Sequence, residues 1–312
     1  MAYTYPDSVD NIYLLDNRFF GFPRYGSAFV VKGENKTVLV DTGDCNQPEA
    51  IRSEMARVGV TIKDIDYIFI THCEHNDHAG NAGFLAMENP DVKICINPAG
   101  EEYLTHPELE AAERKRILPP GMAERFGMMH PVDPKQLYYL TDGEEFDIGG
   151  DTLKVIFAPG HQPSGIVIEE SRNKVLFIND LCGMYLAEFD FAIHLTPDKS
   201  SPVQALEALR KLSNNTYDWL ALGHYGFCDD PDKVINGSIG RIEQLMAIAE
   251  KCEAEGTLDQ LRQRIKEQVT GPKIEKLGEV CEEYLYVYLR DELGPNLCNG
   301  FARFYDRYRA SR

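Results

Sequence analysis

The stretch that decides the fold lies at residues 67–78 and reads Y-I-F-I-T-H-C-E-H-N-D-H. Its first part, Tyr67–Thr71, is a short run of apolar and β-branched residues, which predicts a buried strand. Three histidines and one aspartate then occur between His72 and His78. Neutral imidazole and carboxylate are the ligands that borderline divalent metals prefer. The sequence therefore predicts a strand that ends at a metal site.

Three later segments have the same form, because each places a potential ligand after a short β-like run. They read P-G-H at 159–161, N-D at 179–180 and G-H at 223–224. Loops on a rigid scaffold are where catalytic groups are usually placed. A hydrolytic two-metal site needs several such ligands for each ion, one bridging group and open positions for water and substrate. The predicted ligands are His72, His75, Asp77, His78, His161, Asp180 and His224, with Asp180 as the bridge.

In order and in flanking residues, these segments resemble the metallo-β-lactamase superfamily. That family has an HxHxDH motif after a strand, followed by His, Asp and His at later strand ends. An Asp-Thr-Gly turn at 41–43 also matches, and the resemblance covers about residues 10 to 228. It implies an α/β fold, an αββα sandwich with the metals at one edge. Asp41, Thr42 and Thr71 are then placed to orient the ligands by hydrogen bonds.

The first motif departs from the family pattern by one residue, since seven residues run from His72 to His78 where the family has six. Alignment from the strand makes Glu74 the second ligand, as in the H-x-E-x-D-H motif of flavodiiron-like proteins. Alignment from Asp77 and His78 makes it His75, which we favour because the local spacing is kept. A carboxylate at this position would favour the harder ions Mn²⁺ and Fe²⁺.

The resemblance implies a metallo-hydrolase of enzyme class 3 that holds two divalent metal ions. Zinc is the first expectation, with manganese or iron as alternatives. A metal-bound hydroxide would attack the activated carbonyl of a small organic substrate, which is a lactone, ester, thioester or cyclic β-diketone. The expected catalytic residues are Asp77, Asp180 and His194, the last because its stretch can pass over the site in this family. The alternatives are a flavodiiron-like protein that binds or reduces oxygen and, less favoured, a phosphodiesterase.

Composition excludes other classes. The chain has 312 residues, is 43% hydrophobic and carries a formal net charge of −18, so a nucleic-acid partner is disfavoured. No run reaches the roughly 18 apolar residues of a membrane helix, and the N-terminus lacks the features of a signal peptide. The eight cysteines form no CxxC pair, which favours reduced thiols. We expect a cytoplasmic protein with a small-molecule substrate and no membrane contact.

Strand and helix patterns alternate up to about residue 228 and predict a layered domain over residues 1–230. Residues 98–136 break the rhythm and are expected to form a lid over the site. Residues 231–312 show only helical periodicity, with expected breaks at the Gly-Pro pairs 271–272 and 294–295. We expect this helical region and the insertion to wall one side of the pocket, and the helices to offer a homodimer contact.

Overall fold

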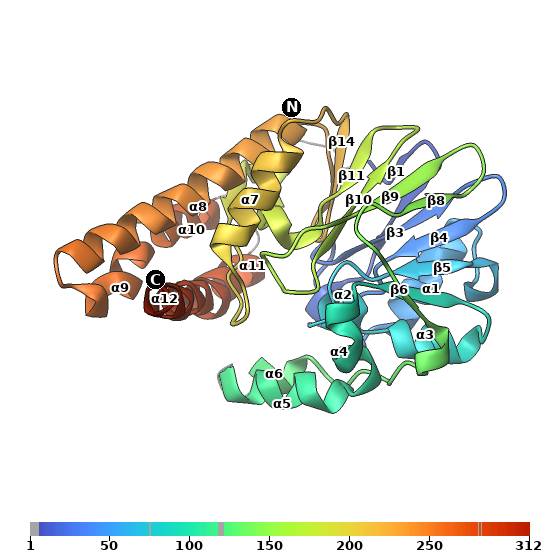
Figure 1. Cartoon of the computed structure of the whole chain (residues 1–312), viewed down its shortest axis with the longest axis horizontal. Helices are drawn as coiled ribbons and strands as arrows, with labels where there is room; N and C mark the ends of the chain where they lie inside the picture. The colour runs from blue at the N-terminus through green and yellow to red at the C-terminus, as the bar shows by residue number, and fades with distance from the viewer. Residues whose placement is uncertain (1–5, 75, 118–121, 280, 282) are drawn as a thin grey trace.

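The computed structural model describes residues 6–74, 76–117, 122–279, 281 and 283–312. Within these ranges the chain forms two large β-sheets that face each other, with helices on both outer sides (Figure 1). This arrangement confirms the predicted αββα sandwich. No helix in the described ranges is long and apolar enough to cross a membrane.

The first sheet follows chain order and changes from antiparallel to parallel pairing at its fourth strand. Most residues of the parallel strands are apolar and buried between a helical layer on one side and the second sheet on the other. Its strands are β1 (Ser8–Val9), β2 (Ile12–Asp16), β3 (Ser27–Lys32), β4 (Thr37–Val40), β5 (Tyr67–Phe69), β6 (Lys93–Ile96) and β7 (Leu137–Tyr139).

The second sheet has the order β15-β14-β11-β10-β9-β8, and β11 and β14 are parallel. A separate hairpin of two strands, β12 (Met184–Leu186) and β13 (Phe191–Ile193), follows β11. The strands of the second sheet are β8 (Glu145–Asp147), β9 (Thr152–Phe157), β10 (Ile166–Glu170), β11 (Val175–Phe177), β14 (Trp219–Leu222) and β15 (Gly226–Cys228).

Three apolar layers hold the sandwich together. The central layer lies between the sheets and includes Phe29, Phe69 and Phe177. The helices α1 (Pro48–Arg57) and α3 (Ala82–Glu88) cover the first sheet through a second layer, and α7 (Pro202–Leu212) covers the second sheet through a third. Burial of these apolar surfaces is the dominant stabilising contribution. Because parallel strands end at the same edge, their following loops converge there.

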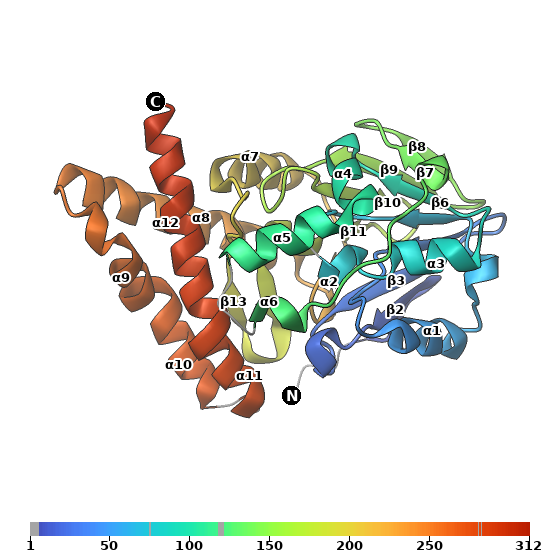
Figure 2. The ribbon, with the colours of Figure 1, turned by 90° about the horizontal axis from the view of Figure 1, so that it is seen from below.

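The insertion at residues 98–136 lies where the C-terminal helices meet the sandwich (Figure 2). Ion pairs connect it to later segments, because Arg116 contacts Asp198 at 3.0 Å and Arg125 contacts Glu292 at 2.7 Å. The short helix α2 (Asn76–Ala79) precedes it, and its described α-helices are α4 (Glu101–Thr105), α5 (Pro107–Ile117) and α6 (Met122–Arg125). Whether this segment moves as a lid stays a prediction.

The C-terminal helices form an apolar core of their own, which includes Phe301 and Tyr305. The long helix α8 (Pro231–Ala254) belongs to two cores, since Ile242 packs on the second sheet and Ala249 on the later helices. The expected domain boundary at residue 230 therefore precedes a helix that both regions share. The later helices are α9 (Leu261–Ile265), α10 (Gly271–Gly278), α11 (Glu283–Tyr288) and α12 (Gly294–Ala310).

The predicted breaks at the two Gly-Pro pairs are wrong. A π-helical turn precedes each pair, Lys266–Thr270 before Gly271 and Leu289–Leu293 before Gly294, and the backbone stays helical through both. Proline lacks a backbone N–H and clashes with the preceding turn of an α-helix. The wider π-turn accommodates this residue without ending the helix.

Candidate metal centre

Two groups of potential ligands share Asp180 at the edge of the sandwich. One contains Asp77, His78, Asp180 and His224, the other His72, His161 and Asp180, and in each the ligand atoms lie within 4.8 Å of one another. The Nε2 atoms of His78 and His161 both lie 3.5 Å from Oδ2 of Asp180, and Nε2 of His224 lies 3.4 Å from its Oδ1. Asp180 therefore occupies the position that a bridging ligand requires.

Strand ends deliver these side chains. His72 follows β5, His161 follows β9, Asp180 lies in a 3₁₀ turn (Asn179–Cys182) after β11, and His224 follows β14. A β-carbon on Gly223 would lie 2.6 Å from Oδ1 of Asp180 and 2.8 Å from Cε1 of His78. Real β-carbon contacts of this length are essentially never seen, so only glycine allows these ligands to approach the chain.

A buried hydrogen-bond network orients His78. Oδ2 of Asp41 lies 3.1 Å from Nδ1 of this ring, and the side chain of Thr42 donates to the His78 carbonyl oxygen at 3.0 Å. Asp41 also accepts hydrogen bonds from Oγ1 of Thr71 and Nδ2 of Asn179, both at 2.8 Å. With Nδ1 engaged, Nε2 points to the ligand cluster, as metal-binding histidines require. These contacts are those expected of Asp41, Thr42 and Thr71, whereas Asn179 was not predicted.

Tyr25 holds His224 in a comparable way. The Nδ1–H of His224 donates to the Tyr25 carbonyl oxygen at 2.5 Å, and the two rings stack with centroids 5.0 Å apart. The Tyr25 hydroxyl donates to the Tyr288 hydroxyl at 3.0 Å, which links the ligand to the C-terminal helices. No local pattern around Tyr25 signals this role, because its partner lies 199 residues away in the chain.

The electrostatics of the cluster favour a cation. Burial opposes the charge of Asp180, but the imidazoles of His224 and His78 outweigh burial and hold its pKa well below the usual range. Burial would lower the pKa of His78, yet the carboxylates of Asp77 and Asp180 raise it well above its usual value. The buried carboxylates beside the imidazoles thus make this cluster favourable for positive charge, which a divalent ion would supply.

The unused acceptor atoms also fit a metal. Nε2 of His78 and Oδ1 of Asp77 are buried and have no hydrogen-bond partner among the described residues. Burying such atoms without a partner is costly, so their position in one cluster needs an explanation. An imidazole and carboxylate donor set suits zinc, manganese or iron. The residues present therefore fit a divalent metal centre.

Of the two candidates for the remaining ligand, Glu74 and His75, the structure describes only Glu74. The buried carboxylate of Glu74 accepts hydrogen bonds from the backbone N–H of Ser164 at 2.9 Å, from its hydroxyl at 2.5 Å and from the Cys73 N–H at 3.1 Å. Both carboxylate oxygens are thus engaged by backbone and hydroxyl groups. His75 lies outside the described residues. These hydrogen bonds hold the Glu74 carboxylate in place, and Glu74 belongs to neither ligand group of the described residues. His75 stays our proposed ligand.

His194 lies apart from the other predicted catalytic residues. It is buried, but it lines a second, smaller cavity rather than the cavity that contains Asp77 and Asp180. Burial lowers the pKa of His194 to about 3, with smaller contributions from Arg241 and His161. Its position does not support proton transfer at the substrate.

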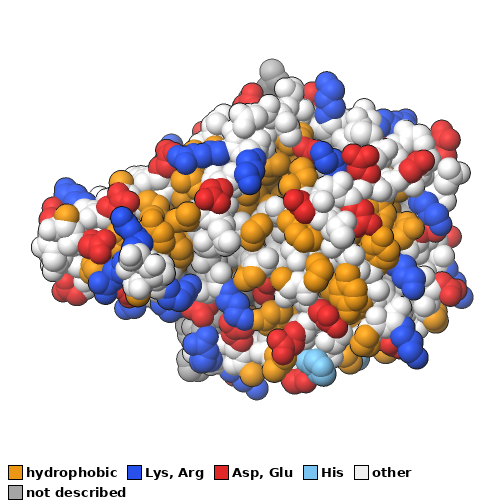
Figure 3. All heavy atoms as spheres, in the orientation of Figure 1, with side chains coloured by type: hydrophobic (Ala, Val, Ile, Leu, Met, Phe, Trp, Pro, Cys, Tyr) orange, Lys and Arg blue, Asp and Glu red, His pale blue; other side chains and the backbone are white. Residues whose placement is uncertain are grey.

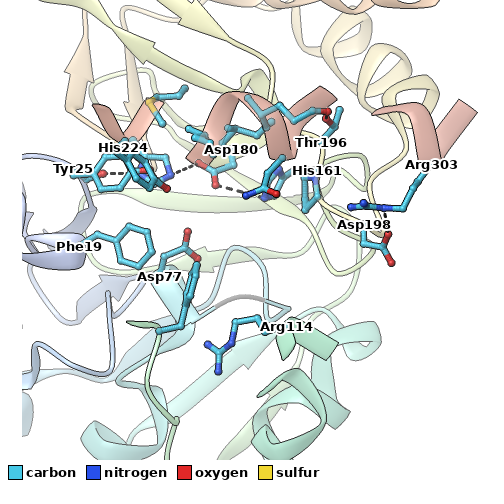
Figure 4. A pocket seen from close by; sticks show the side chains of 18 residues that line it. Phe19, Tyr25, Asp77, Arg114, His161, Asp180, Thr196, Asp198, His224 and Arg303 are labelled. Carbon is cyan, nitrogen blue, oxygen red and sulfur yellow. Dashed lines mark hydrogen bonds and ion pairs between the residues drawn. The ribbon is translucent and has the colours of Figure 1, made fainter. Parts of the chain in front are cut away.

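The ligand cluster opens into a cavity with about 860 Å³ of empty space. Figure 4 shows Asp77, His161, Asp180 and His224 on one side of it and Arg114 across from them. Side chains from the insertion and the C-terminal helices complete the wall, as expected from the sequence. The apolar lining consists of Phe19, Tyr25, Phe126, Met184, Leu195, Pro197, Tyr288, Leu293 and Leu297.

Arg114 is the cavity residue with the most unusual surroundings, and sequence analysis missed it. It is 4% exposed and lies 3.1 Å from the carboxylate of Glu110. Its Nη2 donates to the Gly127 carbonyl oxygen at 2.9 Å, whereas its Nε and Nη1 have no hydrogen-bond partner among the described residues. Two donor groups thus remain for a ligand. The charge run around it in α5 resembles an exposed helix face and concealed this role.

Comparison with solved structures shows the fold over nearly the whole chain. A metallo-beta-lactamase family protein of Thermus thermophilus, TTHA1429, has a TM-score of 0.67 at 18% identity and covers 97% of this chain and 95% of that one. The archaeal superfamily protein ST1585 has a TM-score of 0.64 at 22% identity and covers 76% and 86%. The C-terminal helices are therefore part of a known arrangement.

Sequence comparison agrees. ST1585 of Sulfurisphaera tokodaii is 27% identical over 171 residues, which is 53% of this chain and 59% of that protein. The acyl-coenzyme A thioesterase MBLAC2 of Bos taurus is 25% identical over 190 residues, or 57% and 66%. The matches thus span about two thirds or less of these relatives. The sequence model of the family matches residues 21–224. The chain belongs to the metallo-beta-lactamase superfamily.

Proposed function

We propose that this chain is a metal-dependent hydrolase of a thioester or ester whose apolar acyl part occupies the large cavity. One observation carries the proposal: the carboxylate and imidazole cluster opens into a space walled by aromatic and aliphatic side chains. Ligand sites are usually apolar with a few convergent polar groups, as this cavity is. The thioesterase name of one relative agrees with this substrate class. Lactones and cyclic β-diketones remain in the same reaction class.

The residues divide into two roles. His72, His75 and His161 would hold one ion, Asp77, His78 and His224 the other, and Asp180 both. Bound divalent ions, zinc first and manganese or iron as alternatives, acidify water and polarise a carbonyl. Asp180 and Asp77 are the two carboxylates of the ligand cluster that line the cavity, so we assign them proton transfer between water and the leaving group. The apolar wall would lower the local dielectric constant and so strengthen these electrostatic interactions.

Arg114 adds a requirement on the substrate. Its free guanidinium donors lie across the cavity from the ligand cluster (Figure 4). Arginine is well suited to bidentate recognition of carboxylate and phosphate groups. We therefore propose a substrate with an anionic group separated from the scissile carbonyl by an apolar portion. Glu110 beside it would keep the arginine in place when no substrate is bound.

The test combines metal analysis with a substrate panel. Protein purified without oxygen is analysed for zinc, manganese and iron and is then assayed with acyl thioesters, esters, lactones and cyclic diketones, each with and without a carboxylate. We expect a bound divalent metal and the highest kcat/KM for an anionic thioester or ester. Iron together with oxygen uptake and no hydrolysis would instead support the diiron alternative. Activity only on phosphodiesters would contradict the proposal.

The contacts of Glu74 favour the carbonyl hydrolase over the diiron alternative. That alternative rested on Glu74 as a carboxylate ligand, and that carboxylate is hydrogen bonded to Ser164 and Cys73. The phosphodiesterase alternative still faces the net charge of −18. Charges of both signs are interspersed over the face in Figure 3. The carbonyl hydrolase is therefore the function that we propose.

A further inference from the structure

The second cavity lies directly behind the wall of the large cavity, since Thr196 and Leu297 line both. It has about 340 Å³ of empty space between the β12–β13 hairpin and the C-terminal helices. Its free interior accepts little more than one water-sized sphere. Any ligand there is consequently monatomic or nearly so.

Three nitrogen-bearing side chains line this cavity from three elements. Arg241 comes from α8, Lys273 from α10, and His194 follows β13. No aspartate or glutamate is among the residues that line it, and in the described ranges neither Arg241 nor Lys273 has a carboxylate oxygen within 4.0 Å. Arg241 and Lys273 are both only partly exposed, so two cationic side chains share this cavity without an acidic residue among those that line it.

The hydrogen bonds of these groups are incomplete. Arg241 donates from Nη2 to the Cys182 carbonyl oxygen at 3.3 Å, while its Nε is buried and has no partner among the described residues. Lys273 donates a long hydrogen bond, 3.4 Å, to the Ala192 carbonyl oxygen. His194 is 5% exposed, and its Nδ1 has no partner within the described part of the chain. An arginine has five N–H donors and a lysine three, so several remain for a ligand.

The two positive charges in this cavity, on Arg241 and Lys273, repel each other. Burial lowers the pKa of Arg241, and burial together with Arg241 lowers that of Lys273. Charges that are partly withdrawn from water without an acidic partner are unfavourable, and two like charges in one cavity repel each other. A bound anion would remove both the repulsion and the missing hydrogen bonds. Because His194 is neutral at pH 7, it would serve as a hydrogen-bond donor without adding charge.

We propose that this cavity is a binding site for one small monovalent anion of the size of chloride, held by Arg241, Lys273 and His194. The anion would connect α8 and α10 to the β12–β13 hairpin. It would also secure the Arg241 contact to Cys182, which lies two residues after Asp180. The site therefore couples anion binding to the packing of the C-terminal helices and to the turn that carries the shared metal ligand.

Thermal unfolding of the metal-loaded full chain tests the proposal. Melting temperatures are compared in sodium chloride, sodium bromide, sodium sulfate and sodium gluconate at equal ionic strength. We expect a saturable rise of about 3 °C in chloride and bromide and none in gluconate or sulfate, because those anions exceed the space. Arg241→Gln and Lys273→Gln should each abolish the rise. Lys251→Gln, an exposed change on the same helix as Arg241, should keep it.

Each outcome decides the question. An equal melting temperature in all four salts, or a chloride effect that both cavity variants retain, would overturn the proposal. Should Arg241→Gln fail to fold, Lys273→Gln alone suffices, because its side chain is only half-buried. A crystal soaked in bromide gives a direct check, since an anomalous peak is expected between Arg241 and Lys273. Its absence there, when other bromide sites in the same crystal are occupied, would contradict the assignment.

Discussion

The two ends of the large cavity are built in different ways. The ligand end comes from loops after strands of the sandwich, and hydrogen bonds such as Asp41 to His78 and Tyr25 to His224 fix its rings. The opposite end comes from the insertion and the C-terminal helices, which bring Arg114, Tyr288 and Leu297 to the wall by packing. The ligand end is suited to the hydrolytic reaction that we propose, and the opposite end is suited to substrate selection. Variants at the two ends should therefore affect different kinetic constants.

The largest effect is expected at the ligand end. Asp180→Ala removes the one carboxylate that both ligand groups share. We expect kcat to fall by about a hundredfold or more, the scale for groups that position charge in the transition state. The fold should persist, since the apolar layers do not involve this residue. Metal content, circular dichroism and turnover check this, and near-normal turnover in a folded, metal-depleted variant would refute the site.

A paired test sharpens the assignment of the remaining ligand. His75→Ala should reduce the bound metal by about one ion and lower kcat, whereas Glu74→Gln should keep the metal. Glu74→Gln should instead lower the melting temperature, because hydrogen bonds to its charged form are worth about 1.5–3 kcal/mol each. Metal analysis and thermal unfolding of both variants separate these outcomes. The reverse pattern would make Glu74 the ligand and restore the diiron alternative.

A smaller effect, confined to KM, is expected for variants of Arg114 at the end of the cavity opposite the ligand cluster. The double variant Glu110→Gln/Arg114→Gln removes the charge across from the ligands without leaving a buried carboxylate unpaired. We expect KM for an anionic substrate to rise about tenfold with little change in kcat, since one charged hydrogen bond of about 1.4 kcal/mol is lost. A neutral ester should be unaffected. Lys115→Gln, exposed on the same helix, is the control, and equal losses for both substrates would argue against anion recognition.

Glu110 is expected to have little effect on turnover but a measurable effect on the pH dependence of stability. Burial raises its pKa from 4.5 to about 7, although Arg114 opposes this shift. The folded state therefore binds more protons than the unfolded state. The stabilisation that protonated Glu110 gives to the folded state is complete below about pH 4.5 and is lost as pH rises through about 7. Compared with the Glu110→Gln variant, the wild type should lose up to about 3 kcal/mol of unfolding free energy between about pH 4.5 and 8. A difference in unfolding free energy that does not vary with pH would contradict this.

The ligand end was largely predictable, and the far wall was not. Strands such as Ser27–Lys32 and most of the expected ligands follow from local patterns, because candidate ligands come soon after the strands β5, β9, β11 and β14 in the chain. The insertion and the helices were correctly expected to wall the cavity. Their contributing residues were not identified, since Arg114 lies in a charge run that is typical of an exposed face. The predicted helix breaks at the Gly-Pro pairs were wrong because a π-helical turn before each pair lets the helix continue, and local sequence rules do not predict such turns.

The sequence by itself identified the family and the layered sandwich, and it predicted a set of candidate metal ligands. Each of these depends on residues that are neighbours in the chain or on apolar periodicity, and both can be read without coordinates. Only the tertiary structure decided that Glu74 bonds to Ser164, that His194 faces a second cavity with Arg241, and that Tyr25 orients His224. These roles depend on contacts between distant segments. Packing selects such contacts from many that local chemistry would allow.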